Sequence, residues 1–298
     1  MSFRTIVVNS RSKLSLQLGY LVCRGEQETR VHLNEISTII VQNTGVSITT
    51  SLMVELNRKN INVIFCDEKA QPSFSITPFA HGHRSFGTFK KQIAWDEETK
   101  AVVWSKIVYE KILNQRQVLA IQGKEEAAKL LDQYLLEIEK GDVTNREGHA
   151  AKVYFNALFG TEFSRRKDHI VNGPLNYGYS IILSAINRYL VASGYLTQLG
   201  IWHDSEFNQF NLGCDLMEPI RPFVDLLTLQ LDDLENFKPS LANILNIKVK
   251  FNDKNTLLDT ALQQYVYNFI KVMNESNPNV LKFPKHYELS IYANNNIF

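Results

Sequence analysis

The segment TPFAHGHRSFGTFKKQIAW, residues 77–95, separates two stretches of the chain whose apolar residues repeat with different periods. It is interrupted by one proline and two glycines, Pro78, Gly82 and Gly87. Neither the period of a strand nor that of a helix survives across it. We therefore predict a linker over residues 78–95, between one domain at residues 1–77 and another at residues 96–298.

Ahead of this segment, β-branched and apolar residues form short runs separated by Asn, Ser, Gly and charged residues, as in strands joined by tight turns. The predicted strands are Arg4–Val8, Lys13–Leu16, Tyr20–Cys23, Val31–Leu33, Thr38–Val41, Val46–Ile48 and Asn62–Cys66. A helix is predicted at Ser51–Asn60, where the apolar spacing is helical. The N-terminal domain is therefore predicted to be small and β-rich.

Beyond the segment, helical spacing dominates and no stretch alternates like a strand. The predicted helices cover approximately residues 96–120, 123–139, 145–159, 175–193, 215–231 and 257–275. The predicted class is α+β, with a small β-rich N-terminal domain followed by a larger all-α C-terminal domain. A chain of 298 residues has the length expected of two domains.

The charges are nearly balanced: the chain has 32 basic and 31 acidic residues, and its formal net charge is +1. This balance argues against a protein that coats nucleic acid indiscriminately, but it allows local basic patches. The cysteines (Cys23, Cys66 and Cys214) lie far apart without a CxxC pair, so neither a disulfide framework nor a structural zinc site is expected. No apolar run approaches the ~20 residues of a membrane span, and we expect a soluble cytoplasmic protein.

The first candidate acid lies in NREGHAAKVYFNALFG, residues 145–160, where Asn145 can cap a helix. Glu147 shares the side of that helix that carries Ala150 and Tyr154. A carboxylate on a packed helix face costs free energy unless a cation meets it. Taken alone, however, Glu147 is explained more simply as a first-turn glutamate favoured by the helix dipole.

The other candidates lie further along the chain. His203 follows a glycine-containing loop, and an isolated histidine in such a setting is more often structural than a ligand. Asp215 and Glu218 share a helical face that Arg221 continues. By itself, this Asp-x-x-Glu pattern predicts a capping box, with Asp215 as N-cap and Glu218 reaching back to its amide. Pro219 agrees, because proline is tolerated near a helix start.

Considered together, these residues favour a metal site. Two carboxylates and one imidazole suit Mg²⁺ or Mn²⁺ with open positions for water and phosphate, and the imidazole tilts the preference slightly towards Mn²⁺. The set contains neither cysteine nor a second histidine, so zinc is disfavoured.

These segments resemble the signature blocks of a known family. NREGHAAKVYFNALFG (145–160), LGIWH (199–203) and FNQFNLGCDLMEPIRPFVD (207–225) are similar to those of CRISPR-associated protein one, the integrase subunit that inserts new spacers. The blocks are especially like the version found in type II systems. The resemblance covers essentially the whole chain, because the β-rich front, the linker and the helical body follow in the family's order.

The resemblance implies that Glu147, His203 and Glu218 are the metal ligands and catalytic residues. Many relatives carry Asp at the last position, where this chain has Glu218, so the ion can sit differently here. Asp215 matches a second acidic position of the family and is expected to orient the ligands by contacting them without binding the metal itself. Arg221 is expected to orient a carboxylate or contact phosphate.

The activity implied is metal-dependent transesterification, which joins the 3′-hydroxyl ends of protospacer DNA to the repeat borders of a CRISPR array, together with endonuclease activity on DNA. The implied partners are double-stranded DNA, a second copy of the chain bound through the β-rich domain, and the small CRISPR-associated protein two. In type II systems the effector nuclease and an accessory adaptation protein join them. The residues expected to contact DNA are Arg146, Arg165, Arg166, Lys167, Lys90 and Lys91.

Two other functions remain open at this stage. One is a metal-dependent nuclease that cuts branched or linear DNA without joining it, with water in place of the 3′-hydroxyl. The other is a non-catalytic scaffold that binds DNA ends and whose acids only cap helices.

Overall fold

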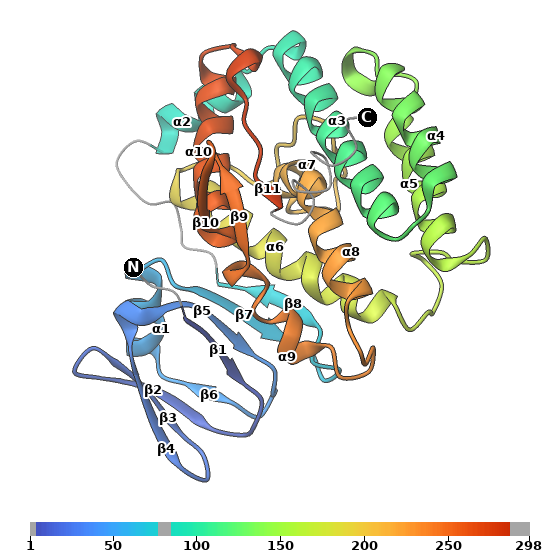
Figure 1. Cartoon of the computed structure of the whole chain (residues 1–298). Helices are drawn as coiled ribbons and strands as arrows, with labels where there is room; N and C mark the ends of the chain where they lie inside the picture. Colours follow the sequence, from blue (N-terminus) through green and yellow to red (C-terminus); the bar gives the residue numbers. More distant parts are fainter. Residues whose placement is uncertain (1–3, 77–84, 287–298) are drawn as a thin grey trace.

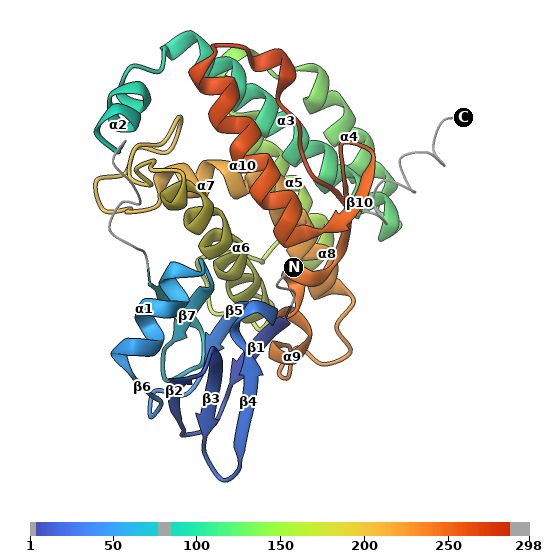
Figure 2. The ribbon, with the colours of Figure 1, turned by 90° about the vertical axis from the view of Figure 1, so that its left-hand side faces the viewer.

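The structure is a computed structural model that describes residues 4–76 and 85–286. A β-rich N-terminal part lies against a larger helical part (Figures 1 and 2). The predicted α+β class, with strands first and helices after, is confirmed.

The N-terminal part contains two four-stranded sheets, one α-helix and a 3-10 turn at Leu33–Glu35. The first sheet runs in the order β1 (Arg4–Val8), β5 (Ile36–Val41), β7 (Asn62–Cys66) and β8 (Pro72–Ser75). The second sheet runs in the order β4 (Glu28–His32), β3 (Tyr20–Arg24), β2 (Lys13–Gln17) and β6 (Ser47–Ile48). Helix α1 covers Thr50–Arg58. Strand β8 was not predicted, because it has four residues and begins with a proline, as many loops do. Its Phe74 is exposed.

The core of this part consists of apolar side chains from both sheets and α1, including the fully buried Leu14, Ile39 and Leu52. All six residues of β5 are buried. This strand pairs in parallel with β1 and with β7. Its continuous ISTIIV run is what a central parallel strand needs, because both of its faces are covered.

The helical part is built around α3 and α6, which contact most of its other helices. Its longer helices are α3 (Glu97–Ile121), α4 (Glu125–Leu136), α5 (Arg146–Phe159), α6 (Asn172–Ala192) and α10 (Leu258–Asn274). Its shorter helices are α7 (Asn211–Met217), α8 (Arg221–Leu229) and α9 (Lys238–Leu241). None among the described residues is long and apolar enough to cross a membrane.

A short helix, α2 (Ser85–Ile93), lies inside the segment predicted as a linker. The first residues of that segment, up to 84, fall outside the described residues. Gln92 of α2 is buried, and its side-chain amide bonds to the backbone of Leu196 and Leu199 at distances between 2.8 and 3.2 Å. The helix is too short for a helical period to be detected in the sequence, and contacts with distant residues stabilise it.

The helical part also carries a small antiparallel sheet that was not predicted, in the order β10 (Lys254–Leu257), β9 (Lys248–Phe251) and β11 (Lys285–His286). Asn252 and Asp253 join β9 to β10, and both have positive φ angles, 52° and 60°. Two such residues form the tight hairpin turn that matches strand twist. Strands of two to four residues are too short to show a period.

The two parts are joined through α6. Arg188 donates to the backbone oxygens of Ser37 at 3.2 Å and Asn60 at 3.0 Å. Gln42 donates to the hydroxyl of Tyr177 at 2.8 Å. The N-terminal sheet therefore rests directly on the helix that forms the centre of the helical part.

Candidate functional site

Two carboxylates from distant segments meet at one buried lysine. Glu147 lies in the first turn of α5, and Glu218 lies where α7 ends. Lys111 of α3 donates to both, at 2.5 Å to Oε2 of Glu218 and through a short bond to Oε1 of Glu147. Lys111 and Glu218 are only 5% and 4% exposed. The cation that a buried carboxylate pair requires is thus a side chain of the protein itself.

The start of α5 fixes the direction of Glu147. The carboxylate of Asp142 accepts from the amides of Arg146 at 2.8 Å and Glu147 at 3.0 Å, and Asn145 accepts from the amide of Gly148 at 3.2 Å. The cap predicted at Asn145 is confirmed, whereas the contribution of Asp142 was not predicted. Glu147 keeps 28% of its side chain exposed, so this carboxylate lies at the edge of the buried cluster.

Arg221 holds the other oxygen of Glu218, with Nε at 2.8 Å from Oε1. Its guanidinium lies over the ring of Tyr179, 4.7 Å from the ring centre. Burial raises the pKa of Glu218, but Arg221 and Lys111 outweigh it and lower that pKa from 4.5 to about 2. Glu218 is therefore a fixed, ionised carboxylate.

His203 is oriented by Asp215, a fully buried carboxylate. Asp215 accepts from the amides of Ile201 at 2.7 Å, Trp202 at 3.2 Å and His203 at 3.0 Å. It also contacts Nδ1 of the His203 ring at 2.7 Å, and this hydrogen bond raises the pKa of the imidazole. With Nδ1 engaged, Nε2 is the ring nitrogen that can bind a ligand.

The capping-box interpretation of Asp215 and Glu218 is wrong. Helix α7 already begins at Asn211, so Asp215 lies inside the helix, and Glu218 contacts Lys111 and Arg221. The sequence pattern is ambiguous because a short-range spacing does not show that the partners of these acids lie in another loop and another helix.

Glycine and tryptophan shape the loop that carries His203. A side chain at Gly200 would place its Cβ 2.2 Å from the backbone oxygen of His203, so only glycine fits. Trp202, 49% exposed, stacks on the buried Trp104 of α3 with ring centres 5.3 Å apart. Trp104 also meets the His203 ring edge-on at 5.8 Å. Helix α3 therefore supports both the imidazole, through Trp104, and the acid pair, through Lys111.

The predicted ligands are only partly brought together. Among residues 4–76 and 85–286, no three His, Cys, Asp or Glu side chains form a group that could hold a metal ion as they stand. Glu147 and Glu218 meet at Lys111, while His203 is engaged with Asp215. The donor set nonetheless fits a cation, because both carboxylates already share one and Nε2 is not used by Asp215. Mg²⁺ or Mn²⁺ coordination by Glu147, His203 and Glu218 stays a prediction.

The basic residues predicted to contact DNA divide into two groups. Arg146 pairs with Glu137 at 3.2 Å, and Arg165 bonds to the side chains of Asn172 and Asn176. These two arginines are therefore engaged in contacts within the chain. The exposed members are Lys90, Lys91, Arg166 and Lys167.

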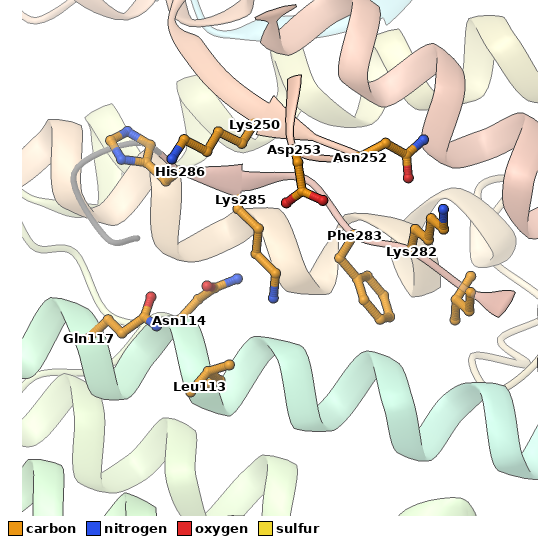
Figure 3. A pocket seen from close by; sticks show the side chains of 11 residues that line it. Leu113, Asn114, Gln117, Lys250, Asn252, Asp253, Lys282, Phe283, Lys285 and His286 are labelled. Atoms are coloured by element: carbon orange, nitrogen blue, oxygen red, sulfur yellow. The ribbon is translucent and has the colours of Figure 1, made fainter. Parts of the chain in front are cut away.

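A cleft of about 750 Å³ lies between α3 and the small sheet. Figure 3 shows the side chains that line this cleft, which the sequence did not predict. Three lysines line it, Lys250, Lys282 and Lys285. The side chain of Lys285 extends towards α3, where it pairs with Glu110. Asn114 also lines the cleft and donates at 2.9 Å to the oxygen of Pro219, the residue after Glu218. Asn114 therefore connects the cleft to the segment that carries Glu218, although the lysines of the cleft lie far from that segment in the sequence.

Another buried carboxylate, Asp225, was not predicted. It accepts from the hydroxyl of Tyr154 at 2.9 Å and, through a short bond, from that of Tyr179. Burial raises the pKa of Asp225 from 3.8 to about 6. Since Arg221 lies over Tyr179, this cluster supports the arginine that holds Glu218.

These features define a class of protein with paired β-sheets in front of a helical body, and with an acid pair and an oriented imidazole arranged along one central helix. Residues 5–256 match the family model described as CRISPR associated protein Cas1. The chain belongs to this family.

Individual relatives agree. The chain is 34% identical over 302 residues to a protein of Neisseria meningitidis serogroup C (strain 8013) named CRISPR-associated endonuclease Cas1, covering 98% of this chain and 99% of that protein. Among solved structures, a casposase bound to integration product has the same fold, with a TM-score of 0.75, 18% identity and coverage of 92% and 91%. A Cas6-RT-Cas1–Cas2 complex matches with a TM-score of 0.73 and 18% identity, covering 93% of this chain and 36% of that longer chain.

Proposed function

We propose that this protein is the DNA integrase of a CRISPR adaptation system of type II. In this proposal it joins the 3′-hydroxyl ends of protospacer DNA to the repeat borders of a CRISPR array by transesterification. The observation that carries the proposal is the convergence of Glu147 and Glu218 on one buried cation, beside a His203 that Asp215 orients. Membership of the Cas1 family and the fold shared with a casposase bound to integration product support it.

The residues proposed to hold Mg²⁺ or Mn²⁺ are Glu147, Glu218 and Nε2 of His203. A divalent ion bound there would polarise the scissile phosphate and lower the pKa of the attacking 3′-hydroxyl. Asp215 fixes the ring so that Nε2 points away from it, and Arg221 fixes the carboxylate of Glu218. Both contacts reduce the reorganisation required at the moment of reaction.

The proposed DNA surface is local and basic. The cleft beside α3 is lined by Lys250, Lys282 and Lys285, next to the segment that carries Glu218, and Lys285 is already paired with Glu110. The exposed Lys90, Lys91, Arg166 and Lys167 add to it. Such groups bind backbone phosphates without reading sequence, which suits a protein that accepts many different protospacers.

The proposed partners are a second copy of this chain, bound through the β-rich part, and the small protein Cas2. The fold shared with part of a chain from a Cas6-RT-Cas1–Cas2 complex supports the Cas2 assignment. In a type II system the effector nuclease and an accessory adaptation protein would join the assembly. The proposed location is the cytoplasm, which suits the free Cys23, Cys66 and Cys214.

The proposal is tested by strand transfer. Protein, Cas2, a DNA with free 3′-hydroxyls and a repeat-bearing plasmid are incubated with Mn²⁺, and joined products are counted. Glu147→Gln should lower the yield by more than about 100-fold, beyond the 10–100-fold typical of residues that only support ligands. Glu137→Gln, which removes an exposed glutamate paired with Arg146, should leave the yield within about twofold. Strand transfer that survives Glu147→Gln would disprove the proposed site.

A second candidate is a nuclease that cuts DNA without joining it, and the word endonuclease in the name of the Neisseria relative favours it. The same residues would serve, with water as the attacking group. The assay separates the two, since cleaved but unjoined products support the nuclease. If neither product forms while DNA ends are bound equally by the wild type and Glu147→Gln, the non-catalytic scaffold is favoured.

A further inference from the structure

Lys111 occupies an unusual place for a lysine. It is the buried lysine among the described residues, at 5% exposure, whereas lysines are almost always exposed unless paired. Its ammonium contacts Glu147 and Glu218 at once, and these are the carboxylates proposed to hold a divalent ion. The side chain therefore stands where a bound cation would be expected.

Packing on both sides fixes the position of Lys111 on α3. One residue earlier, Glu110 pairs with Lys285 of β11. One turn later, Asn114 donates to the oxygen of Pro219 and ties α3 to the segment that carries Glu218. The ammonium is thus delivered to the acid pair by a helix that is anchored at neighbouring positions, and the contact is part of the fold.

The charges of this cluster cancel. Lys111 and Arg221 carry two positive charges, and Glu147 and Glu218 carry two negative charges. Arg221 contacts Glu218, whereas Lys111 contacts both carboxylates. Adding a divalent ion while Lys111 stays in place would bring the charge of these four groups to +2, which the carboxylate of Asp215 behind His203 offsets only in part, and this is unfavourable in a partly buried site.

We propose that Lys111 is a resident cation that holds Glu147 and Glu218 together until a divalent metal ion displaces it, so that Lys111 sets the affinity of the site for the metal. This inference rests on the proposed metal-dependent function. It assigns different roles to the two cations of the cluster. Lys111 carries a compact charge on a flexible stem, so its ammonium is the group proposed to leave the carboxylates. Arg221, stacked over Tyr179, stays with Glu218.

The test measures Mn²⁺ binding by calorimetry, in the absence of DNA, for the full chain and three variants. Lys111→Met should bind Mn²⁺ at least about tenfold more tightly than the wild type, because no ammonium has to be displaced. Lys111→Arg, which keeps a charge, should not bind more tightly. Lys140→Met is the control, since it removes an equal charge from a lysine paired with the exposed Glu98, and it should bind like the wild type.

A thermal measurement provides a second readout. In a chelator, Lys111→Met should have a lower Tm than the wild type, because two carboxylates are left with Arg221 alone. Excess Mn²⁺ should raise its Tm by more than it raises that of the wild type, as tighter binding to the native state requires. An equal or weaker Mn²⁺ affinity of folded Lys111→Met would overturn the inference.

The wild-type protein offers a check that does not depend on how the variants fold. With ¹⁵N-labelled lysine, the buried Lys111 ammonium should give a slowly exchanging NMR signal that disappears or shifts when Mg²⁺ is added. A signal unchanged at saturating Mg²⁺ would show that Lys111 is not displaced. If neither the wild type nor Lys111→Met binds any divalent ion, the metal-dependent function itself fails. Binding by the wild type without tightening in Lys111→Met defeats only the role of Lys111.

Discussion

The two parts of the molecule bury different kinds of side chain. Within residues 4–76, the buried polar residues are neutral, namely Ser12, Ser15, Ser37, Thr38 and Asn62. Within residues 85–286, the buried set includes acidic and basic residues, namely Glu110, Lys111, Asp142, Asp215, Glu218, Asp225 and His286. Burying a charge costs free energy unless it is paired, and such pairs rarely improve stability over apolar packing. The buried charged residues, including Glu218, which is proposed to bind a metal ion, therefore lie in the helical part, whereas the described core of the β-rich part buries no charged residue.

The largest expected effect on stability comes from a substitution in the core of the β-rich part. Leu14 is fully buried between the sheets and α1, so Leu14→Ala should lower the free energy of unfolding by about 2–5 kcal/mol. Urea unfolding measures this decrease. Below the transition, the variant should bind Mn²⁺ like the wild type, because no group of the acid pair changes. A reduced Mn²⁺ affinity in the folded variant would show that the core of the β-rich part also affects the proposed metal site.

In the helical part, Asp225 should make stability depend on pH. Its pKa is about 6 in the folded protein against an ordinary value of 3.8. Because the folded value is raised, its contribution to stability is fully present below pH 3.8 and is lost as the pH rises through about 6. The decrease in stability amounts to about 3 kcal/mol over this window.

Asp225→Asn should remove this step, because the amide can still bond to Tyr154 and Tyr179 but does not ionise. The measurement is the free energy of unfolding of the wild type and the variant at pH 4 and pH 7. The exposed Asp232→Asn controls for a change in net charge. If the wild type and Asp225→Asn show the same pH dependence, the raised pKa is wrong.

The smallest effect concerns the surface and leaves both cores intact. Arg166 and Lys167 are exposed, whereas Arg165 holds Asn172 and Asn176, so the surface pair is the better test of phosphate binding. Arg166→Ala with Lys167→Ala should flatten the log–log salt dependence of duplex DNA binding by about 0.9 for each phosphate that the variant no longer neutralises. Stability should be unchanged. An unaltered slope would remove this cluster from the DNA surface.

Sequence reasoning succeeded where the signal is local and repeated. The runs Arg4–Val8 and Asn62–Cys66 predicted β1 and β7 with the bounds observed, and helical spacing predicted α3 and α5 within one residue at each end. It failed for α2, β8 and the small sheet, which are short and are held by partners elsewhere in the chain. Periodicity needs several repeats before it exceeds chance, and these elements do not provide them.

Periodicity and motif resemblance are properties of neighbouring positions. They were therefore sufficient to predict strands first and helices after, and to suggest Glu147, His203 and Glu218 as site residues. They did not determine what those residues contact. Lys111 reaches Glu147 across 36 positions and Glu218 across 107 positions, and no short-range spacing encodes such contacts. The packing of α3 against the segments that carry these acids places Lys111 between them. This contact depends on the tertiary structure, because a buried carboxylate must be paired with a cation that lies close to it in space.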